Sequence, residues 1–216
     1  MPKGITHDSS HQQKDVMQNY YRLHAKIYDA TRWSFLFGRT AIIRQLPLDK
    51  QQPVHILEVG CGTGYNTALL AKHYPNAQIT ALDVSEEMIA KARQKTKAYQ
   101  ERVKLVAEPY GQYCEAVDAP LDAVLFSYSL SMINPQWEEV ILKAKSDLKP
   151  NGCVAIVDFH RSKFPWFEAH MGNNHVRMDS HLLPFLNKHF RSSTSTTHKA
   201  YGGIWEYMMF IGKRTS

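Results

Sequence analysis

Continuous apolar runs alternate with amphipathic stretches over the middle of the chain. The apolar runs predict strands at 54–60, 78–85, 103–108, 121–130 and 153–160. The stretches between them predict helices at 67–74, 86–100 and 134–148. Strands this apolar are buried on both faces, so their alternation with helices indicates a parallel sheet with helices on both sides. We therefore expect an α/β fold.

Polar residues mark the ends of two predicted helices. Ser85 is expected to cap helix 86–100, because its hydroxyl can accept a hydrogen bond from a free N–H of the first turn. Asn134 is expected to cap the next helix, with Pro135 in its first turn.

The two flanks depart from this alternation. Residues 1–15 are polar and predict a flexible tail. An aromatic-rich helical pattern, broken at Gly38, predicts an N-terminal helical lid over 16–45. After the fifth strand, an aromatic and basic segment and a Ser/Thr stretch fill 161–200, which we expect on the substrate side. Residues 202–214 predict a terminal strand, antiparallel at the sheet edge.

Length and charge limit the class of protein. A chain of 216 residues favours one domain, predicted here over 16–216. Lys and Arg exceed Asp and Glu by six, and residues 160–216 hold 8 bases against 3 acids. This surplus points to an anionic partner for that end, but it is too mild for a nucleic-acid binder.

Cysteine and histidine spacing argue against a disulfide framework and a metal site. Cys61, Cys114 and Cys153 lie far apart, which favours a reducing, cytoplasmic location and no thiolate zinc site. The histidines at 170, 175 and 181 do not align on one helical face. No apolar run approaches the ~18 residues that span a bilayer, so any membrane contact is expected at the surface.

The most informative motif is EVGCGTG at 58–64, where the first strand ends. Alternating glycines let the backbone turn sharply beside a ligand, and ligands bind where parallel strands end. The dinucleotide fingerprint needs glycines at offsets 0, 2 and 5, but offset five from Gly60 is Tyr65 and from Gly62 is Thr67. Glu58 would also repel a diphosphate and suits a cationic ligand.

Asp83 ends the second strand, 19 residues after Gly64. A carboxylate there can accept both hydroxyls of a ribose. The pattern therefore favours a nucleoside that carries positive charge, a description that S-adenosylmethionine meets.

The segments ILEVGCGTGYNTALLAKHYP (56–75) and ALDVSEEMIAKAR (81–93) resemble the class I S-adenosylmethionine-dependent methyltransferases. The resemblance implies a Rossmann-like three-layer sandwich around a mostly parallel seven-stranded sheet with an antiparallel terminal strand. It also implies S-adenosyl-L-methionine as cofactor, with S-adenosyl-L-homocysteine as product. The implied cofactor-binding residues are Tyr28, Glu58, Gly60, Cys61, Gly62, Thr63, Gly64, Asp83, Val84, Met88, Glu108, Pro109, Ser127 and Tyr128.

Each part of that set has an implied role. The three glycines would lie against the amino-acid part of the cofactor, and Asp83 would hold the ribose. Val84 or Met88 would flank the adenine, and Glu108 stands where many members have Asp. The residues that end the fourth strand, Ser127 and Tyr128, would lie beside the sulfonium, and Tyr28 would lie near the methionine end. Cys61 is interpreted as a small residue that lets the loop pack.

Three further segments resemble a subgroup, the diacylglyceryl-homoserine N-methyltransferases, which make betaine lipids. They are YYRLHAKIYDATRWSFLFGR (20–39), SYSLSM (127–132) and HVRMDSHLLPFL (175–186). The resemblance implies successive N-methylation of a lipid headgroup amine. Two alternatives stay open: methylation of a quinone precursor or another small molecule, and binding of S-adenosylmethionine without catalysis.

The candidate catalytic residues are His160, His24 and Tyr128. His160 ends the fifth strand, and Asp158 two residues before it could orient it as a base. A hydrogen-bonded structural histidine is the alternative. Residues 161–178 combine aromatic and basic side chains, which suits either an anionic membrane surface with a lipid headgroup or a lid over the substrate.

Overall fold

The computed structural model describes residues 36–111, 114–117 and 120–214. The chain divides into two compact units, Met1–Phe37 and Gly38–Ser216, and the sheet lies within the second. Its strands are β1 (His55–Val59), β2 (Gln78–Asp83), β3 (Val103–Ala107), β4 (Leu121–Ser127), β5 (Leu148–Ser162), β6 (Arg191–Ala200) and β7 (Trp205–Lys213). Its α-helices are α2 (Arg39–Arg44), α3 (Tyr65–His73), α4 (Glu86–Lys95), α5 (Trp137–Asp147), α6 (Pro165–Asn173) and α7 (Leu182–His189).

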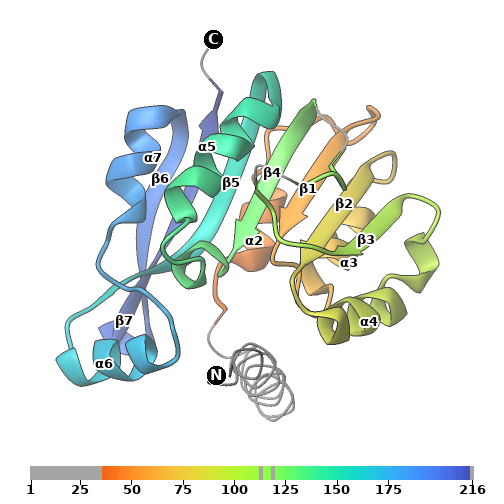
Figure 1. Ribbon diagram of the computed structural model, residues 1–216. Coiled ribbons are helices and arrows are strands. Elements are labelled where there is room, and N and C mark those ends of the chain that lie inside the picture. Colours follow the sequence, from red (N-terminus) through yellow and green to blue (C-terminus); the bar gives the residue numbers. More distant parts are fainter. Residues whose placement is uncertain (1–35, 112–113, 118–119, 215–216) are drawn as a thin grey trace, which may run out of the picture. The chain divides into compact units, whose positions relative to one another are not determined.

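The strands form one mixed sheet in the order β3-β2-β1-β4-β5-β7-β6 (Figure 1). Strands β1 to β5 pair in parallel, and β7 runs antiparallel to both of its neighbours. This mostly parallel seven-stranded sheet with an antiparallel terminal strand is the predicted α/β architecture, so the predicted fold class is confirmed.

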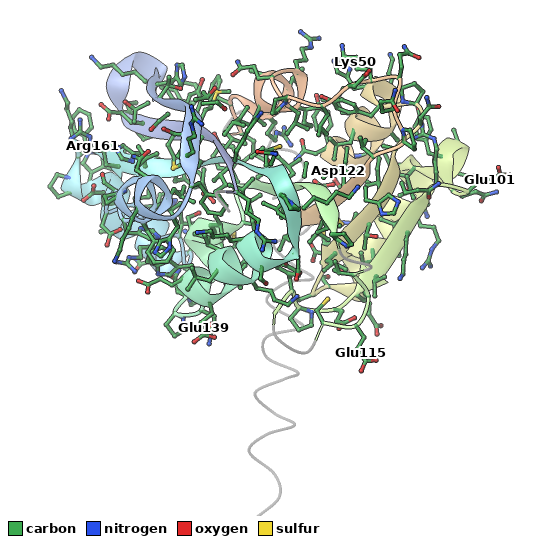
Figure 2. The ribbon with its side chains drawn as sticks, turned by 90° about the horizontal axis from the view of Figure 1, so that it is seen from above. Lys50, Glu101, Glu115, Asp122, Glu139 and Arg161 are labelled. Atoms are coloured by element: carbon green, nitrogen blue, oxygen red, sulfur yellow. The ribbon has the colours of Figure 1, made fainter. Side chains whose placement is uncertain are left out.

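Helices cover both faces of the sheet. Leu57 and Phe126 face one side, where they share a buried cluster with Ile141 of α5 and Leu186 of α7. Glu58 faces the other side, towards Thr67 of α3. Figure 2 separates the two layers, because Lys50, which follows α2, and Glu139 of α5 lie on opposite sides of the sheet.

The predicted strands and most of the helix boundaries agree with the structure to within a few residues. The capping prediction at α4 is confirmed, because Ser85 Oγ accepts a hydrogen bond from Met88 N at 3.3 Å. The Asn134 cap is wrong, because α5 begins only at Trp137. The Asn134 side chain instead donates to the carbonyl of Ser131 at 2.9 Å, in the turn before the helix.

The end of the sheet differs from the prediction. The terminal strand β7 is antiparallel, but it lies between β5 and β6, and β6 forms the edge. The β6 sequence, RSSTSTTHKA, is exposed along almost its whole length. A strand that buries neither face shows no apolar alternation, and a polar edge also discourages pairing with other chains. Helices α6 and α7, in the same region, were not predicted either.

The N-terminal predictions mostly lie outside the described residues. This holds for the tail 1–15 and for the lid up to residue 35. The expected break at Gly38 is present, since its φ of 80° precedes α2. Within the described ranges, no helix combines the length and the apolar character needed to cross a membrane.

Candidate functional site

Four strand ends meet at one edge of the sheet. The parallel register places Val59 beside Leu82 and Phe126, and Ser127 beside Val157. The chain segments that leave β1, β2, β4 and β5 are therefore neighbours at the lower edge in Figure 1, where α6 also lies. This edge holds the glycine motif and the predicted site residues of the strand ends.

The glycine loop needs glycine for both conformation and space. Gly60, Gly62 and Gly64 have φ values of 76°, 53° and 77°, in the left-handed region that side chains disfavour. A Cβ on Gly60 would lie 2.7 Å from Ser129 Cβ, and one on Gly64 would lie 2.9 Å from Ala92 Cα. Two N–H groups, those of Gly60 and Cys61, donate to the carbonyl of Leu82 at 2.8 and 2.9 Å. The loop is thus held against the end of β2 and packs without room for a side chain.

Glu58 lies fully buried beneath this loop. Thr67 Oγ1, from the first turn of the following helix, donates to Glu58 Oε2 at 2.5 Å. A buried carboxyl group needs such partners, because losing them exposes the full cost of its desolvation. Next to it, Cys61 is also buried, and Thr63 Oγ1 accepts from Lys95 Nζ at 3.3 Å.

Replacing Thr67 with Val should lower the free energy of unfolding by about 1–3 kcal/mol, because it removes a hydrogen bond to a buried carboxyl group. Urea denaturation measures this change. Thr197→Val, on the exposed face of β6, is the matched control and should change stability by less than about 0.5 kcal/mol. Equal effects of the two substitutions would show that the Thr67 bond does not support Glu58.

Asp83 fixes the geometry of the loop from the end of β2. Its Oδ2 accepts from Gly62 N at 2.8 Å, and its Oδ1 accepts from Ser85 N at 3.0 Å. A carboxylate has about four lone-pair positions, and these two bonds use two of them, so about two acceptor positions remain for hydroxyl groups of a ligand. Beside it, Val84 is 72% exposed, whereas Met88 is buried. An acceptor for hydroxyls therefore lies next to an apolar surface that a flat ring can cover.

Two serine hydroxyls at the end of β4 are buried without a partner. Ser127 Oγ and Ser129 Oγ make no hydrogen bond within the part of the chain that the structure describes. Burying a hydroxyl unpaired is costly, so each of these groups calls for a partner such as an ordered water or a ligand. Because Ser129 packs on Gly60, polar atoms of a ligand lying on the glycine loop can supply these bonds. Sequence reasoning missed Ser129, although its alternation with Ser127 was a usable signal.

Tyr128, between these serines, has a φ of 55°, unusual for a residue with a side chain. Its buried ring packs edge-on against Phe159 with centroids 4.8 Å apart. Burial, and to a smaller extent Asp158, raises the pKa of its phenol well above the usual value. The phenol is therefore neutral near pH 7, and strain of this kind clusters at functional sites.

His160 does not end the fifth strand as predicted, because β5 continues to Ser162 and His160 lies at a register shift between Phe159 and Arg161. Its buried Nδ1 finds no hydrogen-bond partner in the described ranges. Burial, with a contribution from Arg161, lowers the pKa of its imidazole, so the ring is neutral near pH 7 and can accept a proton. The hypothesis that Asp158 orients His160 does not agree with the contacts. The Asp158 carboxylate instead accepts from the backbone N–H groups of Ser131 at 3.1 Å and of Phe159 at 2.8 Å.

The remaining predicted residues are less constrained. Glu108 Oε1 accepts from Glu115 N at 3.1 Å, and the neighbouring Pro109 is exposed, so their contact with adenine stays a prediction. Tyr28 and His24 lie outside the described residues. Over the ranges that the structure covers, no three His, Cys, Asp or Glu side chains are grouped to hold a metal ion.

The segment 161–178 is folded as the end of β5, α6 and a loop. Trp166 is 63% exposed and Phe164 is 42% exposed. Two of the bases are paired: Arg161 Nε with Glu206 Oε2 at 2.8 Å, and Arg177 Nε with Asp179 Oδ2 at 2.7 Å. Glu206 and Asp179 are two of the three acids already counted in the net charge of residues 160–216, so the positive surplus of this region remains.

Comparison with known proteins agrees with this geometry. The family model "Methyltransferase domain" matches residues 56–152, which run from β1 into the first part of β5. The malonyl-[acyl-carrier protein] O-methyltransferase of Priestia megaterium is 32% identical over 76% of this chain and 58% of its own. The trans-aconitate 2-methyltransferase of Methylobacterium nodulans is 29% identical over 53% of this chain and 41% of its own. The chain thus spans less than two thirds of either relative.

A solved structure shares the architecture of the sheet and its helices. The 1,6-didemethyltoxoflavin-N1-methyltransferase of Burkholderia thailandensis, with bound 1,6-didemethyltoxoflavin and S-adenosylhomocysteine, superimposes with a TM-score of 0.69 at 18% identity. The match covers 100% of this chain and 94% of that one. The structural similarity shows a shared fold, and the family match is confined to residues 56–152.

Proposed function

We propose that this chain is an S-adenosylmethionine-dependent methyltransferase that acts on a small molecule. The observation that carries the proposal is the hydrogen bond from Gly62 N to Asp83 Oδ2, which unites the glycine loop and the carboxylate. This pair lies within residues 56–152, the range that matches the methyltransferase domain family. The unpaired serines suit the amino-acid part of S-adenosylmethionine, and the apolar Val84 suits its adenine, which adds support.

Four groups of the chain would hold the methyl donor. Asp83 would accept the ribose hydroxyls, and Val84 with Met88 would flank the adenine. The glycine loop would lie against the amino-acid part, whose polar atoms Ser127 and Ser129 would reach. When bound, S-adenosylmethionine supplies a methyl group that its sulfonium already activates. The chain therefore needs chiefly to orient the acceptor and keep water out, effects worth up to ~7–11 kcal/mol in favourable cases.

His160 is the side chain that would take a proton from the acceptor. Its Nδ1 is unpaired within the described ranges and its imidazole is neutral near pH 7, as a base requires. Tyr128 would present a neutral aromatic ring and a phenol beside the same strand ends. His24 and Tyr28 remain candidates from the sequence.

The relatives favour a small-molecule or acyl acceptor. One methylates an oxygen of malonyl-[acyl-carrier protein] and the other is a trans-aconitate methyltransferase, and neither is a diacylglyceryl-homoserine N-methyltransferase. Methylation of a lipid headgroup amine is the second candidate. The specific observation that favours it is the exposed pair Phe164 and Trp166 beside Lys163, which suits a membrane surface.

Transfer of label from methyl-labelled S-adenosylmethionine would test this proposal. The full chain is incubated with a malonyl thioester, with a water-soluble metabolite extract and with anionic lipid vesicles. We expect label in the thioester or the metabolite fraction, and label in lipid alone would support the second candidate. Binding without transfer to any fraction would contradict catalysis and favour a binding module.

A further inference from the structure

A fully buried carboxylate lies directly behind the candidate site. Asp158 is 0% exposed, near the end of β5. Its Oδ2 accepts from Ser131 N at 3.1 Å, and its Oδ1 accepts from Phe159 N at 2.8 Å. One of these bonds reaches the short 3-10 helix Leu130–Met132 that follows β4, so the carboxylate joins two strand ends.

Ser131 is in turn a junction between two other segments. Its carbonyl accepts from Arg177 N at 2.9 Å, in the loop between α6 and α7. A second bond, from Ser180 N to the carbonyl of His160 at 2.9 Å, ties the same loop to β5. Two residues before Ser131, Ser129 packs on Gly60 of the glycine loop. The turn that packs on the glycine loop and the loop after α6 therefore both contact Ser131, whose N–H donates to Asp158.

We propose that Asp158 is a positioning residue whose ionised carboxylate holds the turn 129–132 against the glycine loop and so makes methyl-donor binding depend on its charge. The inference rests on the proposed function and adds regulation by protons at the same site. A carboxylate accepts from both N–H groups at once. Protonation on Oδ2 places a hydroxyl opposite the Ser131 N–H, which weakens that bond and releases the turn.

The titration of Asp158 falls in an accessible pH range. Burial raises its pKa to about 6, and the hydrogen bonds from Ser131 and Phe159 oppose that rise. The groups around Asp158 are uncharged near pH 7 or are already paired, so they do not account for a change of charge near pH 6. From β4, Tyr128 is a neutral phenol near pH 7; from β7, the neighbouring position is the apolar Met208; and His160 on β5 is neutral near pH 7. The Arg177 guanidinium is paired with Asp179.

The sign of the stability effect separates positioning from a structural role. The folded-state pKa lies above the unfolded value, so the ionised form weakens the fold above about pH 6 and this cost disappears as pH falls. An uncharged isostere should therefore not destabilise the fold at neutral pH. If the role of Asp158 were to stabilise the fold, the uncharged isostere would lower the free energy of unfolding at neutral pH.

Calorimetric titration with S-adenosylhomocysteine, from pH 5 to pH 8, tests the proposal on the full chain. Wild type should bind with an affinity that falls several-fold as pH drops through about 6. Asp158→Asn should bind at least tenfold more weakly at pH 7.5, without that pH dependence, while its Tm is unchanged or raised. The matched control is Asp147→Asn, another buried aspartate, which accepts from Tyr110 and Lys143 at the end of α5 and should leave the affinity and its pH dependence as in wild type.

Three results would overturn the inference. The first is Asp158→Asn binding as wild type does. The second is a large fall in Tm that accompanies the weaker binding, which would make Asp158 structural. The third is an unchanged pH dependence in the variant. If wild type itself does not bind the probe, the proposed function fails as well, so the two failures are distinguishable.

Discussion

Replacing Asp83 with Ala is expected to weaken binding of S-adenosylhomocysteine by about 100-fold or more. Hydrogen bonds to a charged group contribute about 1.5–3 kcal/mol each, so losing two ribose contacts removes roughly 3 kcal/mol or more. The substitution also frees the N–H groups of Gly62 and Ser85, which the carboxylate now holds. Loss of loop geometry therefore adds to the loss of direct contacts.

Calorimetry or equilibrium dialysis measures this effect. Asp122→Ala is the matched control, since Asp122 stands at the start of β4 and accepts from Lys149 Nζ and from His55 N. This substitution should leave the affinity within about twofold, because the start of β4 lies at the opposite edge of the parallel sheet from the end of β2. An Asp83→Ala variant that binds as tightly as wild type would show that Asp83 does not hold the ribose.

Replacing Gly60 with Ala is expected to abolish measurable donor binding and to lower the free energy of unfolding by about 1–3 kcal/mol. The left-handed backbone of Gly60 costs a side-chain residue ~1–2 kcal/mol. The new Cβ would also lie 2.7 Å from Ser129 Cβ, so the turn after β4 must move away from the loop. Both the loop and the buried serine hydroxyls would then be misplaced.

Gly172→Ala is the control for this substitution. A Cβ at Gly172, inside α6, meets no heavy atom within 4 Å, and Ala is the better helix former by about 1 kcal/mol. It should therefore keep or raise stability and leave donor binding unchanged. Denaturation and calorimetry on both variants check the pair, and equal effects would contradict the close packing at Gly60.

The parallel core of the fold follows from the sequence because burial on both faces makes its strands continuously apolar. β4 and β5 carry runs such as AVLF and CVAIV, and turn residues bound them. β6 offered no such signal, since exposure on both faces lets Ser and Thr fill it. The Asn134 cap failed because a competing local bond, to the Ser131 carbonyl three residues earlier, holds its side chain in the turn before the helix.

The donor side of the site was predictable for a similar reason. Glycines with positive φ and a carboxylate at a strand end are backbone requirements, and they leave a fixed spacing in the sequence. The partners of Asp158 and the packing of Ser129 on Gly60 depend on which segments meet in space. No spacing along the chain encodes those contacts, so only the structure reveals them.

The measurement that tests the central claim most directly is equilibrium dialysis of the full chain against labelled S-adenosylmethionine, with NAD as competitor. The account predicts saturable binding of one molecule per chain that excess NAD does not displace, because the glycine spacing and the buried Glu58 disfavour a diphosphate. Binding of NAD in place of S-adenosylmethionine, or no binding of S-adenosylmethionine at all, would contradict it.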